Sequence, residues 1–131
     1  MKKQSKTKVY EFDVPLYPRK LWVAVGKDVK TVFNKIDPIN GTVQNEAPDA
    51  IAFTTTVRDT ENYRGVLIWL VELKEITPGI IAHESLHALD YFMWAIHHGP
   101  HNYEDDNEPD AYLLEWIVDK VTECLTKYKK K

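Results

Sequence analysis

The sequence lacks the features that mark secreted and membrane-spanning proteins. It has a single cysteine, Cys124, so no disulfide can form within the chain, which fits a reducing compartment. The basic N-terminus is not followed by the apolar run that a secretory signal peptide needs. The longest apolar run, Val66 to Val71, has six residues, whereas about 20 are needed to cross a bilayer. We therefore expect a cytoplasmic protein that does not span a membrane.

The sequence also lacks an excess of positive charge. It has 17 Lys and Arg residues against 20 Asp and Glu residues, a formal net charge of −3, which argues against a nucleic-acid partner. Repeats, low-complexity tracts and linkers rich in Gly or Ser are absent from the sequence, and 131 residues fit one domain. Lysines gather at both ends of the chain. We expect a single domain over residues 9–128, between a flexible basic tail at 1–8 and a basic tail at 129–131.

The first half of the chain has the alternating and apolar patterns of strands. Tyr10, Phe12 and Val14 alternate with acidic residues, which indicates a half-buried strand. The other expected segments are a strand at Leu21–Val25, a helix at Val29–Ile36, a loop at 37–49, and strands at Ala50–Val57 and Val66–Leu73. The polar segment between the last two strands predicts an antiparallel hairpin.

Two long helices are predicted in the second half. Thr77 can cap the first helix, Pro78 suits its first position, and the helix can run to His98. A polar, acidic loop follows at residues 100–107, and the second helix begins near 107–109 with a continuous apolar stripe. Strands followed by two long helices predict an α+β fold.

The first of these helices contains the pattern H-E-x-x-H at residues 83–87. His83 and His87 lie one turn apart on the same helix face, so both imidazoles can bind one Zn²⁺ ion at about 2.0–2.1 Å. Glu84 is offset by about 100° around the helix, where it can hold a metal-bound water without binding the metal. The pattern therefore predicts two zinc ligands and a general base, as in metallopeptidases.

The order of these elements resembles the zincin metallopeptidases, and it is most similar to a minimal form of their glutamate-liganded branch, the gluzincins. The segment IAHESLHAL has the apolar flanks of a zincin helix. The later segment NEPDAYLL is similar to small HExxH proteins encoded by bacteriophages and prophages, in which a Glu precedes Ala-Tyr at the start of the last helix. The resemblance spans roughly residues 65–125. It implies a small, antiparallel-rich sheet packed against the HExxH helix and a C-terminal helix.

Catalytic zinc usually has three protein ligands, so a third is expected here. Glu108 holds the place of the gluzincin ligand, with 20 residues between it and His87. An acidic residue at a helix start is also favoured by the helix dipole, independently of any metal. Asp110, Glu115 and Glu104 therefore remain alternative ligands.

The sequence departs from two related patterns. Longer gluzincins carry an Asp four residues after the ligand Glu, where this chain has Tyr112. Metzincins continue the motif with a Gly and a third His, where this chain has Asp90 and Met93. The metzincin branch is therefore disfavoured, and a supporting carboxylate must come from elsewhere in the chain.

Two further residues have candidate roles. Asp90 follows His87 by one turn and could accept the spare N–H of a ligating histidine, and a surface aspartate is an equally good interpretation. Tyr112 could stabilise an oxyanion, but packing is the more common role for such a residue. We interpret a second histidine group, His97, His98 and His101, as a helix end and not as a metal site.

The sequence thus predicts a zinc-dependent peptidase that acts on a peptide or protein substrate. Zincins commonly bind substrate as an extra strand at a sheet edge, and by this resemblance Val66–Leu73 is the nearest candidate strand. The alternative is a phage structural or host-interaction protein that keeps the zincin fold without turnover. The expected location is the cytoplasm of a bacterial or phage-infected cell, with association with a virion as an alternative. The substrate and the oligomeric state are left open.

Overall fold

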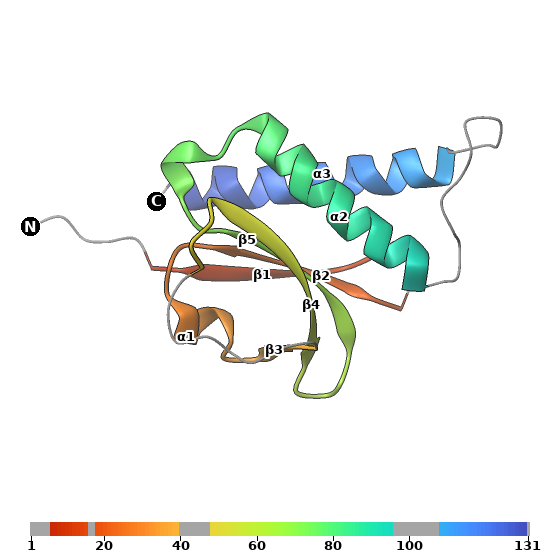
Figure 1. The fold of residues 1–131 in the computed structure, drawn as a ribbon, viewed down its shortest axis with the longest axis horizontal. Coiled ribbons are helices and arrows are strands. Elements are labelled where there is room, and N and C mark those ends of the chain that lie inside the picture. The colour runs from red at the N-terminus through yellow and green to blue at the C-terminus, as the bar shows by residue number, and fades with distance from the viewer. Residues whose placement is uncertain (1–5, 16–17, 40–47, 96–107, 131) are drawn as a thin grey trace, which may run out of the picture.

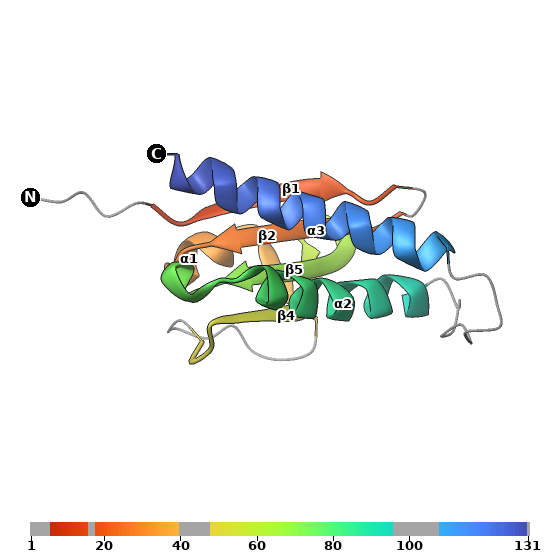
Figure 2. The same ribbon diagram turned by 90° about the horizontal axis from the view of Figure 1, so that it is seen from above.

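The computed structural model describes residues 6–15, 18–39, 48–95 and 108–130. In this part of the chain, a five-stranded mixed sheet carries two long helices on one face and a single-turn helix on the other (Figures 1 and 2). The prediction of an α+β fold with a strand-rich first half and two long helices is therefore confirmed.

The strands lie in the order β1-β2-β5-β4-β3. Their bounds are β1 Lys8–Asp13, β2 Lys20–Val25, β3 Ile36–Pro38, β4 Ala52–Asp59 and β5 Arg64–Leu70. Neighbouring strands are antiparallel except β2 and β5, which run parallel. The sheet is thus mostly antiparallel, and β5 lies inside it.

Strands β4 and β5 form the predicted hairpin, and Asp59 orders its turn. The Oδ1 atom of Asp59 accepts hydrogen bonds from the backbone N–H groups of Glu61 at 2.9 Å and Tyr63 at 2.8 Å. Between them, Asn62 has a φ of 65°, a left-handed conformation that Asn tolerates better than most residues. The local turn chemistry therefore sets the register of the hairpin.

The segment after β2 differs from its prediction. Helix α1 comprises only Val29–Val32, and Ile36 begins β3 instead of ending the helix. Ile36 is 3% exposed and packs in the same apolar cluster as α1. A short strand buries this position as well as a helix does, so helical spacing alone was misleading. Pro38 ends β3, at the edge of the sheet, where a missing backbone N–H is tolerated.

Helices α2 (Pro78–Ala95) and α3 (Glu108–Lys129) cross the same face of the sheet in opposite directions (Figures 1 and 2). Thr77 caps α2 as predicted, since its Oγ1 accepts a hydrogen bond from the backbone N–H of Ile80 at 3.2 Å. Strand β1 includes Lys8 and α3 includes Lys129, one residue beyond the expected domain at each end. Within the described ranges, no helix combines the length and apolar character needed to cross a membrane.

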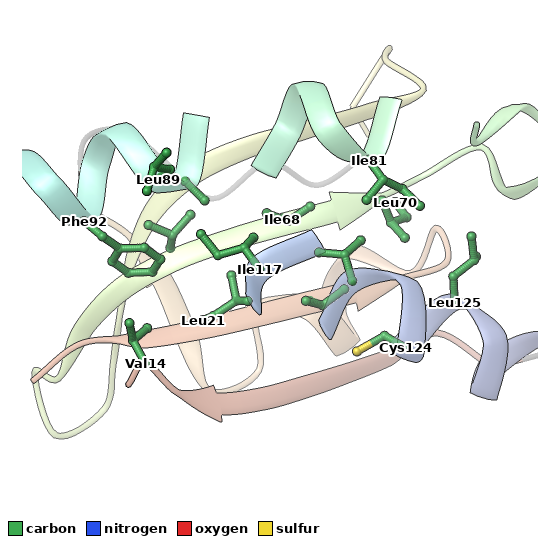
Figure 3. Close-up of a cluster of buried hydrophobic side chains, with 14 of the residues drawn as sticks. Val14, Leu21, Ile68, Leu70, Ile81, Leu89, Phe92, Ile117, Cys124 and Leu125 are labelled. Atoms are coloured by element: carbon green, nitrogen blue, oxygen red, sulfur yellow. The ribbon is translucent and has the colours of Figure 1, made fainter. Parts of the chain in front are cut away.

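The core lies on both faces of β2 and β5. Leu21, Ile68 and Ile117, each with 0% exposure, meet between the sheet and the two long helices (Figure 3). Trp22 and Trp69 belong to a second cluster on the opposite face, with α1. Burial on both faces explains why these two strands read as nearly continuous apolar runs. The packing of α2 on this sheet also determines which side of α2 is left exposed.

Candidate functional site

Helix α2 buries one side and exposes the other. Its buried residues are Ile81, Glu84, Ser85, Ala88, Leu89, Phe92 and Met93. His83 and His87 lie on the exposed side, and the side chain of His83 is 67% exposed. The helical period places the two histidines together there, because the core positions fall on the opposite side.

The two imidazole rings converge. Their Nε2 atoms are 3.3 Å apart, the ring centroids are 4.9 Å apart, and the ring planes meet at 81°. Two nitrogen ligands at about 2.0–2.1 Å from a tetrahedral zinc ion are themselves about 3.3–3.4 Å apart. A hydrogen bond between neutral rings is the alternative explanation, although N–H bonds in proteins usually span about 2.7–3.2 Å. The spacing and the donor type therefore fit zinc.

Glu84 lies beside the histidines but is largely buried, with 7% exposure. Its Oε1 atom accepts a hydrogen bond from the Thr54 hydroxyl at 2.8 Å, and the same hydroxyl is 3.1 Å from the Glu84 backbone oxygen. Its Oε2 atom lies 3.8 Å from Nε2 of His83. One carboxylate oxygen is thus held by the sheet, and the other is next to the histidine pair.

Sequence reasoning did not find Thr54. Thr54 lies in β4, 30 residues before Glu84. Strand alternation groups it with Ala52 and Thr56 on one face of β4. No pattern in the sequence indicates that this face lies under α2, so only the tertiary structure identifies the contact.

The structure does not bring Glu108 to the histidines. Helix α2 continues from His87 to Ala95, about 12 Å of helix. Helix α3 begins at that end of the molecule, and Glu108 is its first residue (Figures 1 and 2). Tyr112 follows one turn later and is 67% exposed. Part of the spacing of 20 residues is used to complete α2 as far as Ala95, and α3 starts far from the motif.

The structure does not bring the alternative third ligands that it describes to the histidines either. Asp110 is partly buried and Glu115 is exposed, both on α3. In the described ranges, no three His, Cys, Asp or Glu side chains are grouped so that they could share a metal ion. Glu104 lies outside the described residues, as does the histidine group at 97, 98 and 101.

The surroundings of the pair are open and partly apolar. Asp90, Leu86 and Trp94 lie on the exposed side of α2, where Leu86 is 49% and Trp94 is 73% exposed. Asp90 makes no hydrogen bond to either histidine in the part of the chain that the structure describes. Two hollows in the described part of the structure are lined by other elements and include no residue of α2. The histidines therefore face solvent from a helix surface.

The strand next to the site is β4, not β5. Val66–Leu73 was expected to offer an edge for substrate, and this is wrong because β5 pairs with β2 on one side and β4 on the other and ends at Leu70. Strand β3 pairs with Val57–Asp59 only, and Ile39 donates one further bond to Thr56. Among the described residues, the outer edge of β4 at positions 52–55 has no strand partner.

Comparison of this chain with models of protein families, with curated proteins and with solved structures found no match. The interpretation of the site therefore depends on its residues and their geometry.

Proposed function

We propose that this chain is a zinc-dependent metallopeptidase in which His83 and His87 bind the ion and Glu84 is the general base. The observation that carries the proposal is the 3.3 Å separation of the two Nε2 atoms, which suits two ligands of one tetrahedral ion. The position of Glu84 Oε2, 3.8 Å from Nε2 of His83, supports the assignment of the base. The HExxH motif and the resemblance to minimal zincins support both.

A zinc ion held by the two histidines would polarise a peptide carbonyl and lower the pKa of a bound water towards ~7. The chain itself must then move one proton. Glu84 Oε2 accepts the proton of the attacking water as the new C–O bond forms. It returns that proton to the amine as the C–N bond breaks. Because Oε1 is already bound by Thr54, the proton goes to Oε2.

The third ligand is proposed from the resemblance alone. Glu108 holds the matching place, and Asp110, Glu115 and Glu104 are the alternatives. The assignment of Glu108 requires the first turn of α3 to lie nearer to His87 in the zinc-bound protein than it does in this structure. Measuring the zinc affinity of four variants, Glu108→Gln, Asp110→Asn, Glu115→Gln and Glu104→Gln, identifies the ligand, since only its loss weakens binding strongly.

The proposed substrate is an extended peptide that pairs with the outer edge of β4. Positions 52–55 of this strand have no strand partner on their outer edge among the described residues, and Thr54, one of these positions, contacts Glu84. Backbone pairing of this kind holds a peptide in an extended conformation beside the catalytic groups. The proposed location is the cytoplasm of a bacterial or phage-infected cell.

The proposal is tested by incubating the zinc-loaded protein with a mixed peptide library and detecting new termini by mass spectrometry. Glu84→Gln should keep its zinc and lose about 100-fold or more of the cleavage rate, the contribution typical of a general base. Glu61→Gln, in the exposed turn of the hairpin, is the matched control and should cleave normally. Full cleavage by Glu84→Gln would show that Glu84 is not the base.

A second candidate function is a non-catalytic, zincin-like protein that binds a partner. The observation in its favour is that the exposed side of α2 presents two large apolar side chains beside the histidines, Leu86 at 49% and Trp94 at 73% exposure. For this function, the wild-type protein would bind zinc but release no new peptide termini. The library experiment above separates the two functions.

A further inference from the structure

The hydrogen bond between Thr54 and Glu84 joins the sheet to the motif helix at the proposed base. The hydroxyl of Thr54 lies 2.8 Å from Oε1 and 3.1 Å from the backbone oxygen of Glu84. Glu84 is 7% exposed, and an ionised carboxylate removed from water is unfavourable unless hydrogen-bond donors reach it. Thr54 provides such a donor.

We infer that Thr54 is a positioning residue that holds Oε1 of Glu84 and leaves Oε2 as the atom that takes the proton. A hydroxyl has a single proton to donate, so its two acceptors compete. A bond to a charged oxygen is shorter and about twice as strong as one to a neutral carbonyl. The shorter distance to Oε1 agrees with this preference, so the hydroxyl donates its hydrogen bond to the carboxylate oxygen Oε1.

This bond fixes the plane of the carboxylate. Rotation of the carboxylate group would remove Oε1 from the Thr54 hydroxyl and would exchange it with Oε2. With the rotation blocked, Oε2 remains 3.8 Å from Nε2 of His83, on the side of the histidine pair. Threonine suits this task because its branched side chain has few rotamers, so the direction of the hydroxyl is set by the backbone of β4. A base held in place requires little reorganisation during reaction.

The consequence for catalysis rests on the proposed function, and steady-state kinetics test it. Thr54→Val keeps the side-chain shape and removes the donor, so kcat should fall about ten- to a hundredfold, with little change in KM or zinc content. Thr54→Ser should recover most of the lost kcat. Thr56→Val, on the same face of the same strand, is the matched control and should keep kcat. An unchanged kcat in Thr54→Val, or no recovery in Thr54→Ser, would overturn the inference.

The contact itself is tested in the zinc-free protein by a double-mutant cycle, which does not depend on peptidase activity. Thr54→Val should lower the equilibrium ratio of folded to unfolded protein about tenfold in the wild-type background. In a Glu84→Ala background, the same change should lower it less than about threefold, because the carboxylate is gone and only the weaker acceptor, the backbone oxygen of residue 84, remains. Equal effects in both backgrounds would overturn the inference. If the wild type cleaves no peptide, the proposed function fails while the cycle still decides whether Thr54 holds Glu84.

Discussion

Ser85 lies within the HExxH motif but points into the core, and replacing it with alanine should stabilise the protein. The side chain is 0% exposed, and its Oγ atom has no hydrogen-bond partner among the described residues. A hydroxyl removed from water without a partner costs about 1–3 kcal/mol. Alanine also has a better helix propensity than serine, by roughly 0.5 kcal/mol. Both effects favour Ser85→Ala.

The lower end of the desolvation range together with the propensity gives a net gain of about 1.5 kcal/mol in the free energy of unfolding. Urea denaturation slopes for small proteins are about 1–3 kcal/mol per molar, so the midpoint should rise by roughly 0.7 M. The melting temperature should rise by about 5 °C for a domain of this size. Zinc content should not change, because Ser85 lies on the buried side of α2, opposite the histidines.

Urea titrations of zinc-free protein measure this effect. Thr122→Ala, at an exposed position of α3, is the matched control because it changes helix propensity without removing a buried hydroxyl. The free energy of unfolding of Thr122→Ala should rise by only about 0.5 kcal/mol. A Ser85→Ala variant that is less stable than the wild type would refute the reasoning. It would mean that the hydroxyl has a partner and that the buried side of α2 is assigned incorrectly.

Three further predictions concern the sheet and the core. Glu11 accepts hydrogen bonds from Lys20 Nζ and Trp22 Nε1, each at 2.8 Å, and chiefly the Lys20 bond lowers the pKa of Glu11 from 4.5. These bonds therefore stabilise the folded protein above pH 4.5, and their contribution is lost as the pH falls through the lowered pKa. Glu11→Gln should lower the free energy of unfolding by about 0.5–1 kcal/mol at pH 7, and by less at pH 3, as measured by urea titration. An equal loss at both pH values would contradict this. Burial raises the pKa of the Cys124 thiol to about 12, so a disulfide reagent at pH 8 should label it only as the protein unfolds, and rapid labelling of folded protein would disprove its burial. Gly65→Ala should lower the free energy of unfolding by about 2–3 kcal/mol, since its Cβ would overlap the backbone oxygen of Lys20 on the parallel strand; an unchanged denaturation midpoint would argue against this pairing.

Elements with several agreeing local signals could be predicted from the sequence. The start of α2 has both a capping Thr77 and a following proline, and the hairpin joins a threonine-rich strand to an apolar strand through a polar turn. The apolar spacing from Val29 to Ile36 had no such second signal. It indicated which residues are buried, but a helix and a helix followed by a strand satisfy that burial equally well.

The sequence predicts where the strands are better than it predicts their order in the sheet. Periodicity reports whether a residue is buried, and it does not report which strands are neighbours. The unbroken apolar run of β5 is typical of a strand buried on both faces, and such a strand is rarely an edge. That pattern argued against Val66–Leu73 as the edge for a substrate, although the sequence did not indicate that β4 takes this place.

Within the site, distance along the chain divides what could be predicted from what could not. His83, Glu84 and His87 lie within one helix, so helix geometry alone places them together. Glu108 depends on where α2 ends and α3 begins, and a count of intervening residues does not determine that position. Thr54 depends on which strand lies under α2. Long-range packing decides both of these placements.

The metal content of the purified protein tests the central claim most directly. After saturation with zinc and removal of the excess, elemental analysis should find close to one zinc ion per wild-type chain. His83→Ala and His87→Ala should each retain far less, because each removes one of two converging ligands. Leu86→Ala, on the same exposed side of α2, should retain the wild-type amount. Zinc well below one ion per chain in the wild type, or an undiminished content in His83→Ala, would contradict the account.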